Sequence, residues 1–197
     1  TQGGCPTFCK ASEPTAGISR ARLYASGLGI YNKSINGQRV GQTDADGTVW
    51  YDELKPGSTD MRSTVFYTTH DVTPLLHEGQ NVLGAEVSSG WWNGGIAHGE
   101  WGNKDCAVRA MLIVTYADGS EDVICTDQSW LSNTNGPLRM GDIYNGETYD
   151  ARRTLAWTTP GYDDADWFAV AQSNDFTGTI RAFEGPAVRA VKALERQ

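Results

Sequence analysis

Polar and apolar residues alternate with a period of two along most of the chain, which is the pattern of strands with one buried face. The clearest case is residues 20–25 and 29–35, after which Asn36-Gly37 supplies a tight hairpin turn into 38–40. A helical turn is expected at Pro74–His77, closed by Gly79. The same alternation predicts strands at 64–69, 81–87, 106–116, 121–126, 138–140, 167–170, 179–183 and 188–194, and near Trp130.

Short strands joined by turns rather than by helices favour two antiparallel sheets packed face to face. We therefore expect an all-β fold, a jelly-roll-like antiparallel β-sandwich with at most short helices. The sandwich is expected to span residues 19–175, after a loose N-terminal segment at 1–18. Residues 176–197 are expected to add further strands, which either complete this module or start the next one.

The turn at Asp118-Gly119 is expected to reverse the strand 106–116 into 121–126. If Ala117 pairs with Ser120, Leu112 lies near Cys125. This register keeps the two later cysteines apart. A local disulfide between the two early cysteines and four free thiols are both compatible with the sequence. The cysteines are Cys5, Cys9, Cys106 and Cys125.

Composition excludes some classes of partner. The 197 residues carry a net charge of −8, so the chain lacks the basic surface that binds nucleic acid or anionic membranes. No apolar run is long enough to span a bilayer, and no membrane insertion is expected. The chain begins without an initiator Met or a signal-peptide apolar segment, so we expect a processed or excised fragment.

A set of short strings follows one another in an order that resembles a known module. They include Ile35-Asn36-Gly37-Gln38-Arg39-Val40-Gly41, His70-Asp71-Val72-Thr73-Pro74-Leu75-Leu76, Glu78-Gly79-Gln80-Asn81-Val82-Leu83-Gly84, Gly90-Trp91-Trp92, Gly146-Glu147-Thr148-Tyr149-Asp150-Ala151-Arg152 and Pro160-Gly161-Tyr162-Asp163-Asp164-Ala165-Asp166-Trp167. In this order they resemble the N-terminal β-sandwich module of bacterial α-L-rhamnosidases, over roughly residues 19–170. Trp130 and Trp167 are expected to anchor the core.

The resemblance implies a galactose-binding-like sandwich in a glycoside hydrolase that removes terminal α-L-rhamnose with inversion. The acid and base carboxylates of such an enzyme lie in a separate helical barrel, so no catalytic residue is expected here. The module is expected either to bind carbohydrate weakly or to buttress the barrel. Its partners would be a rhamnose-containing glycan or glycoside and the catalytic helical barrel of the same polypeptide. The alternatives are a free-standing carbohydrate-binding or adhesion domain, and a small hydrolase, from which no turnover is expected.

Some members of this family hold rhamnose through calcium, with an Asp-Asn pair after a Pro-Gly-Trp-Thr string. Here the string is Pro56-Gly57-Ser58-Thr59, and Arg62-Ser63 takes the place of the pair. Arginine does not ligate calcium, so no metal or other cofactor is expected. Asp44-Ala45-Asp46-Gly47, with Gln42 before it and Glu53 beyond, fits part of a calcium loop, but its flanks are not helical and an acidic surface turn is favoured.

The best candidate ligand surface is the glycine-rich loop at 89–101, because aromatic faces stack on sugars while polar side chains bond to hydroxyls. The alternative for its Trp-Trp pair is a structural plug, and Trp91 is favoured as the core residue. The candidate residues of this loop are Trp91, Trp92, Asn93, His98, Glu100 and Trp101.

A second candidate segment is the polar, aromatic stretch 141–152. Asp142, Tyr144 and Glu147 would line a cleft toward the catalytic domain, whereas the favoured alternative is a hydrogen-bonded turn that fixes the path of the chain. Asp150 and Arg152 are expected to pair within it or with a neighbour. The histidines at 70, 77 and 98 are dispersed, so neither a metal site nor a catalytic triad is expected from them.

Overall fold

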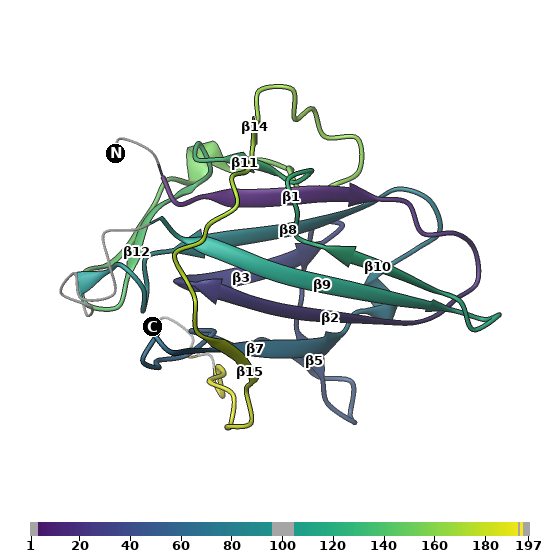
Figure 1. Cartoon of the computed structure of the whole chain (residues 1–197), viewed down its shortest axis with the longest axis horizontal. Helices are drawn as coiled ribbons and strands as arrows, with labels where there is room; N and C mark the ends of the chain where they lie inside the picture. The colour runs from purple at the N-terminus through teal and green to yellow at the C-terminus, as the bar shows by residue number, and fades with distance from the viewer. Residues whose placement is uncertain (1–3, 96–104, 193, 195–197) are drawn as a thin grey trace.

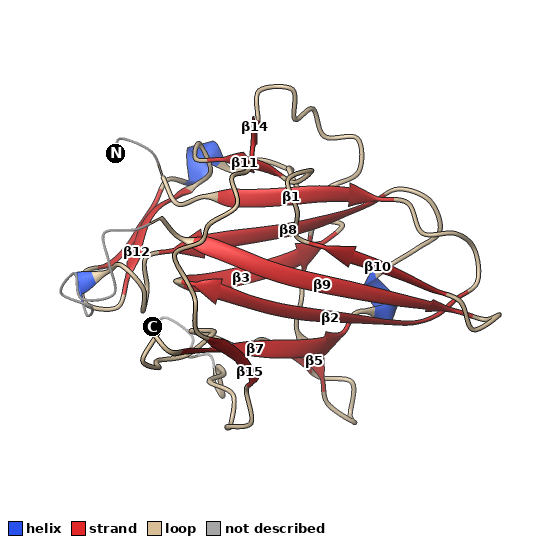
Figure 2. Ribbon diagram, in the orientation of Figure 1, coloured by secondary structure: helices blue, strands red, loops and turns tan. Residues whose placement is uncertain are grey.

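Two β-sheets packed face to face form the body of the protein (Figure 1), and the only helices described are single 3₁₀ turns (Figure 2). The computed structural model describes residues 4–95, 105–192 and 194. The antiparallel sandwich predicted from the alternation of residues is confirmed.

The first sheet has six strands in the order β14-β11-β1-β8-β3-β4, and all of its pairs are antiparallel. It brings together segments from both ends of the chain. Its strands are β1 (Thr7–Ser12), β3 (Ile30–Ile35), β4 (Gln38–Arg39), β8 (Asn81–Ser88), β11 (Leu131–Asn133) and β14 (Phe168–Ala169).

The second sheet has five strands in the order β10-β9-β2-β7-β15. Its pairs are antiparallel except for β15, which runs parallel to β7 at the edge. Its strands are β2 (Ile18–Leu28), β7 (Thr64–Asp71), β9 (Ala107–Tyr116), β10 (Glu121–Cys125) and β15 (Thr179–Ala182).

Two small hairpins project from the sandwich. One joins β5 (Gln42–Thr43) to β6 (Val49–Trp50), and the other joins β12 (Leu138–Asp142) to β13 (Gly146–Tyr149). The 3₁₀ turns that lie wholly within the described residues are η1 (Thr73–Leu75) and η3 (Ala151–Arg153).

The core lies between the sheets, where the inward positions of β2 and β9 meet those of β3 and β8. Each large aliphatic side chain buried there contributes roughly 1.5–3 kcal/mol. Trp130 and Trp167 are 3% and 8% exposed, which confirms both as core anchors. The buried members of the main cluster are Ala21, Leu23, Ile35, Val40, Val72, Leu83, Leu112, Val114, Tyr116 and Trp130.

The predicted hairpin turn forms with the expected backbone. Asn36 and Gly37 have φ values of 51° and 78°, the left-handed region that Asn and Gly tolerate best. The side chain of Asn36 also closes this end of the first sheet, because its Nδ2 donates to Asn81 Oδ1 at 2.7 Å and its Oδ1 accepts from Val82 N at 2.9 Å. The turn residue is therefore also a half-buried hydrogen-bonding partner.

Gly29 carries the chain from the second sheet to the first, between β2 and β3. Its φ of 129° is open to glycine, and a Cβ there would lie 2.1 Å from the carbonyl oxygen of Ser88. No other residue fits this crossing.

Three expectations about the ends of the chain and the pairing of strands were wrong. The segment 1–18, expected to be loose, contains β1, which pairs with β8 and β11 because its apolar face completes that sheet. At the other end of the chain, β15 forms as expected and adds to the second sheet of this same module. The strand expected at 188–194 does not form among the described residues, where only a bridge joins Val188 to Glu53.

The third correction is a register shift of one residue in the β9–β10 hairpin. Ser120 accepts from the backbone N–H of Tyr116 rather than pairing with Ala117, so Leu112 lies opposite Ile124. All four cysteines are free thiols in the structure, with the early pair buried and Cys125 exposed.

Candidate functional site

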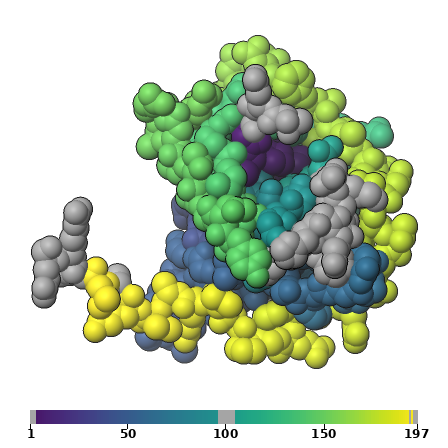
Figure 3. All heavy atoms as spheres, turned by 90° about the vertical axis from the view of Figure 1, so that its left-hand side faces the viewer, coloured from purple at the N-terminus to yellow at the C-terminus, as the bar shows by residue number. Residues whose placement is uncertain are grey.

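The loop that follows β8 and the β12–β13 hairpin meet at one end of the sandwich. Gly90 donates from its N–H to the carbonyl of Gly141 at 3.1 Å and forms a parallel bridge with Asp142. Figure 3 looks onto this end, where the hairpin (green) forms a ridge beside the segment after β8 (teal). Two candidate segments separated by about fifty residues in the sequence therefore lie side by side, as a shared surface requires.

Asp142 holds the two segments together. Its carboxylate accepts hydrogen bonds from the backbone N–H groups of Gly95, Tyr144 and Asn145, the last two at 2.7 Å. Burial acts to raise the pKa of Asp142, but these hydrogen bonds outweigh it and leave the pKa below its usual value. Asp142 is thus a structural staple of the loop, in agreement with the hydrogen-bonded turn favoured from the sequence.

The two tryptophans take the opposite roles to those favoured from the sequence. Trp92, not Trp91, is the core residue, with 2% of its surface exposed and contacts to Leu28, Met61 and Val65. Its indole N–H donates to Asp105 O at 3.2 Å. The chain turns at Gly90, just after β8, and the ring of Trp92 then points inward. The sequence pattern did not indicate this.

The remaining candidates at this end differ in exposure. Trp91 is half-buried and donates from its indole N–H to Leu54 O at 3.0 Å, while Asn93 accepts from Cys106 Sγ at 3.7 Å. Tyr144 is 69% exposed and Glu147 is exposed on the hairpin. The candidates His98, Glu100 and Trp101 lie outside the described residues.

Asp150 and Arg152 pair within their own segment, one of the two arrangements expected. Asp150 Oδ1 accepts from Arg152 Nε at 2.7 Å and from its backbone N–H, so Asp150 caps the η3 turn. Hydrogen bonds from the Arg152 side chain lower the pKa of Asp150 to about 2. This pair fixes the way the chain leaves the hairpin.

A buried polar cluster that was not predicted from the sequence lies between β3 of the first sheet and β7 of the second. Lys33 Nζ lies 2.9 Å from Thr68 Oγ1 and 3.1 Å from His70 Nδ1, and His70 Nε2 lies 3.3 Å from Asp52 Oδ2. Burial lowers the pKa of Lys33 to about 7 and also lowers that of His70. The available signal was the inward position of Lys33 between Tyr31 and Ile35 in the β3 alternation.

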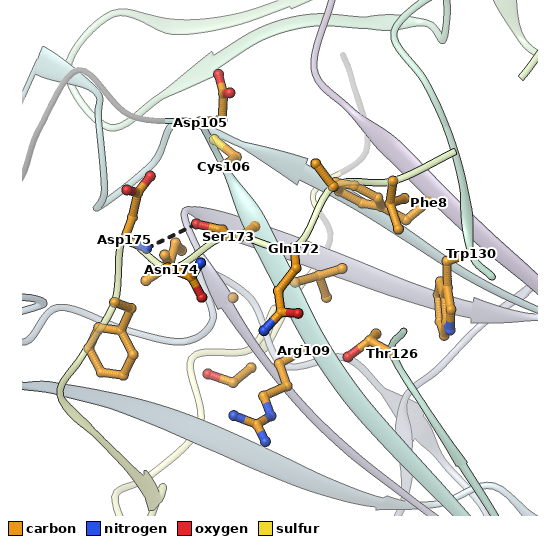
Figure 4. Close-up of a pocket in the computed structure, with 18 of the residues that line it drawn as sticks. Phe8, Asp105, Cys106, Arg109, Thr126, Trp130, Gln172, Ser173, Asn174 and Asp175 are labelled. Carbon is orange, nitrogen blue, oxygen red and sulfur yellow. Dashed lines mark hydrogen bonds between the residues drawn. The ribbon is translucent and has the colours of Figure 1, made fainter. Parts of the chain in front are cut away.

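A wide groove of about 1180 Å³ lies where the segment after β14 crosses toward β15. Arg109 from β9 and Gln172 from the crossing segment extend into it, with Phe8 and Trp130 along one side (Figure 4). The groove was not predicted from the sequence, because its walls come from strands and loops that are far apart along the chain.

The residues that suggested calcium make other contacts in the structure. Asp44-Ala45-Asp46-Gly47 makes the β5–β6 turn, where Asp44 accepts from the indole N–H of Trp50 at 2.7 Å, and Glu53 pairs with Arg39 at 2.8 Å. Arg62 Nε pairs with Asp60 at 3.1 Å. Among the residues that the structure describes, no three His, Cys, Asp or Glu side chains gather in a way that could hold a metal ion.

Comparison with known proteins agrees with the fold and the order of the motifs. The family model of the α-L-rhamnosidase N-terminal domain matches residues 16–192. The chain belongs to this family.

Its relatives are much longer proteins. The chain is 41% identical over 187 residues to an α-L-rhamnosidase of Streptomyces avermitilis, covering 92% of this chain and 17% of the relative. It is 36% identical over 176 residues to an α-L-rhamnosidase of Formosa agariphila, covering 87% of this chain and 18% of the relative. The crystal structure of the Streptomyces avermitilis α-L-rhamnosidase complexed with L-rhamnose superposes with a TM-score of 0.85 and 37% identity, over 98% of this chain and 18% of that one. The chain thus corresponds to an N-terminal module that spans less than a fifth of these rhamnosidases.

Across the described ranges, no helix is long and apolar enough to cross a bilayer.

Proposed function

We propose that this chain is a non-catalytic accessory module of an α-L-rhamnosidase, and that it contacts rhamnose-containing glycans weakly through its loop end. The loop end is the surface formed by 91–95 and 141–147. The observation that carries the proposal is that a family module covering under a fifth of its relatives brings Trp91, Tyr144 and Glu147 to one end of the sandwich. The parent enzyme would hydrolyse terminal α-L-rhamnose, and its catalytic helical barrel would lie elsewhere in the same polypeptide.

The loop end supports weak rather than tight binding. Trp92 and Asp142 are committed to the core and to the loop backbone, so Trp91 and Tyr144 remain as the described aromatic faces for a sugar. Stacking on one aromatic ring contributes only about 0.5–1.5 kcal/mol beyond burial. We therefore expect the dissociation constant of the loop end for a sugar to lie in the millimolar range.

Binding is proposed to be independent of calcium. Arg62 directs its guanidinium to the carboxylate of Asp60 at the place where family members carry their Asp-Asn pair. A cation there would compete with a covalently attached positive charge. Addition of EDTA should therefore leave any response to sugar unchanged.

Titration of the chain with L-rhamnose, followed by amide and indole chemical shifts, tests the proposal. We expect shifts at Trp91 and Tyr144 that saturate in the millimolar range, and a loss of affinity of about 2- to 12-fold in Tyr144→Ala. The matched control is Tyr149→Ala, on the same hairpin and 53% exposed. No shift at millimolar sugar would leave buttressing of the catalytic barrel as the role of the module.

The sequence of the gene distinguishes the accessory module from the alternative, a free-standing binding protein. A helical-barrel segment encoded in the same reading frame supports the accessory module, and its absence would favour the free-standing domain.

A further inference from the structure

A small recess lies between the β5–β6 hairpin, β7 and the segment after β15. Figure 1 shows these elements along the lower edge of the sandwich. Its volume of about 290 Å³ is just below the range of roughly 300–1,000 Å³ for drug-sized ligands, which suits a smaller molecule. Three aromatic residues, Trp50, Tyr67 and Phe183, line it together with polar side chains that include Gln42, Asp52 and Thr69. None of these residues belongs to the loop end.

The aromatic walls are held in place by their own contacts. The indole N–H of Trp50 donates to Asp44 Oδ1 at 2.7 Å, and the guanidinium of Arg189 lies 5.0 Å from its ring centroid. On the opposite wall, the ammonium of Lys55 lies 3.3 Å from the ring centroid of Phe183. Fixed aromatic faces lose little conformational entropy when a ligand stacks on them.

Asp52 supplies an unused acceptor at this recess. Its side chain is only 6% exposed, and Oδ2 lies 3.3 Å from His70 Nε2. The other oxygen, Oδ1, is buried and has no hydrogen-bond partner among the described residues. A buried acceptor without a donor is costly, so a donor brought by a ligand would be favoured.

The charges around Asp52 decide which class of ligand fits. The ammonium of Lys55 lies over Phe183 and the guanidinium of Arg189 lies over Trp50, so a cationic ligand would meet two like charges. An anion would meet the carboxylate itself. A neutral molecule with hydroxyl donors and an apolar face avoids both penalties.

We propose that this recess binds one neutral sugar residue, which stacks on Trp50 or Phe183 and donates a hydroxyl hydrogen to Asp52. Gln42 and Thr69 bond to further hydroxyls at the rim. The site is separate from the loop end and does not depend on the proposed function, because it stands on the aromatic walls and the buried acceptor alone.

Two-dimensional NMR of the intact chain with L-rhamnose and D-galactose, one sugar at a time, tests this site. We expect saturable shifts at the Trp50 indole N–H and at the amides of Thr69 and Gly185. Gln42→Ala and Thr69→Ala, which alter the rim and not the core, should each weaken binding by roughly 2- to 12-fold, the effect of one lost hydrogen bond. Asp52→Asn should weaken it further, provided that its amide spectrum shows an intact fold.

Tyr144→Ala is the matched control, because it changes the loop end and should leave the Trp50 response unchanged. Loss of the Tyr144-dependent shifts alone would count against the loop end and not against the recess. The recess proposal is overturned if neither sugar moves the Trp50 indole signal, if both rim variants respond like the original chain, or if ammonium or acetate produces the same shifts as the sugars.

Discussion

Trp91 and Trp92 are neighbours in the chain with different environments. Trp92 fills a cluster with Leu28, Met61 and Val65, whereas Trp91 lies half-exposed with its indole on Leu54 O. The change Trp92→Ala should lower the free energy of unfolding by about 3–5 kcal/mol, because it leaves a large cavity. Trp91→Ala should cost only about 1 kcal/mol, the value of one hydrogen bond and partial burial. Urea unfolding of both variants checks this, and equal losses would contradict the assignment.

Lys33 makes stability depend on pH. Its pKa is 10.5 in an ordinary setting and about 7 in the fold, because burial disfavours the charged form. Between these values the unfolded chain binds more protons than the folded one, so the free energy of unfolding rises as pH rises through this window. Below about pH 7 the charged ammonium must be accommodated inside the fold, so the stability that is gained at higher pH is absent.

Lys33→Met should remove this rise. We expect the original chain to gain stability between about pH 7 and 8, by at most about 1.4 kcal/mol for each pH unit, and the variant to show no gain. This range stays below the ordinary thiol pKa of 9.0, because titration of Cys5, Cys9 and Cys106 in the unfolded chain would lower stability as pH rises further. Lys192→Met, at an exposed position, is the control and should keep the slope. A slope retained in Lys33→Met would refute the role of this lysine.

At the scale of elements, β1 is the strand on which the first sheet depends. It lies between β8 and β11, with Thr7 opposite both Glu86 and Asn133. Deleting residues 1–12 should leave two strands with unpaired edges and prevent cooperative folding. Circular dichroism and thermal unfolding test this against a chain that ends at Arg189. A cooperative transition in the N-terminal deletion would show that β1 is dispensable.

The sequence predicted the elements whose signals are local. Alternation located β2, β7, β8 and β9, and Asn36-Gly37 located the hairpin turn because both residues tolerate positive φ. It did not locate β1, whose pairing partners lie at least 69 residues away, the separation of Ser12 and Asn81. The β9–β10 register also failed by one residue, since alternation does not say which pair closes a turn.

The candidate site was predictable to a similar degree. The loop at 91–95 and the hairpin at 141–147 were both found, and the staple at Asp142 matches the hydrogen-bonded turn that was favoured. The recess was missed because Trp50, Asp52 and Phe183 come from segments that only the tertiary structure brings together. Which of two adjacent tryptophans points inward depends on the backbone at Gly90, which periodicity does not determine.

For the whole molecule, the absence of catalysis is a prediction. Glycoside hydrolysis with inversion needs an acid and a base on opposite sides of the bond, separated by about 6.5–9.5 Å. The acidic residues of the loop end are Asp142 and Glu147, and Asp142 already accepts hydrogen bonds from the loop backbone, which leaves Glu147 without a free partner carboxylate there. The chain alone should release no chromophore from an aryl α-L-rhamnoside, with the full-length enzyme as positive control. Turnover by the purified chain would overturn the assignment as an accessory module.

The place of β1 also has a consequence during synthesis of the protein. β1 leaves the ribosome before the residues 81–88 and 131–133 with which it pairs, and β14 at 168–169 then completes that sheet. Until those segments emerge, Thr7–Ser12 has no partner, and the apolar face of the early hairpin has nothing to pack against. We therefore expect the module to fold as one unit only after nearly its whole length has been translated, and until then β1 stays open to pairing elsewhere.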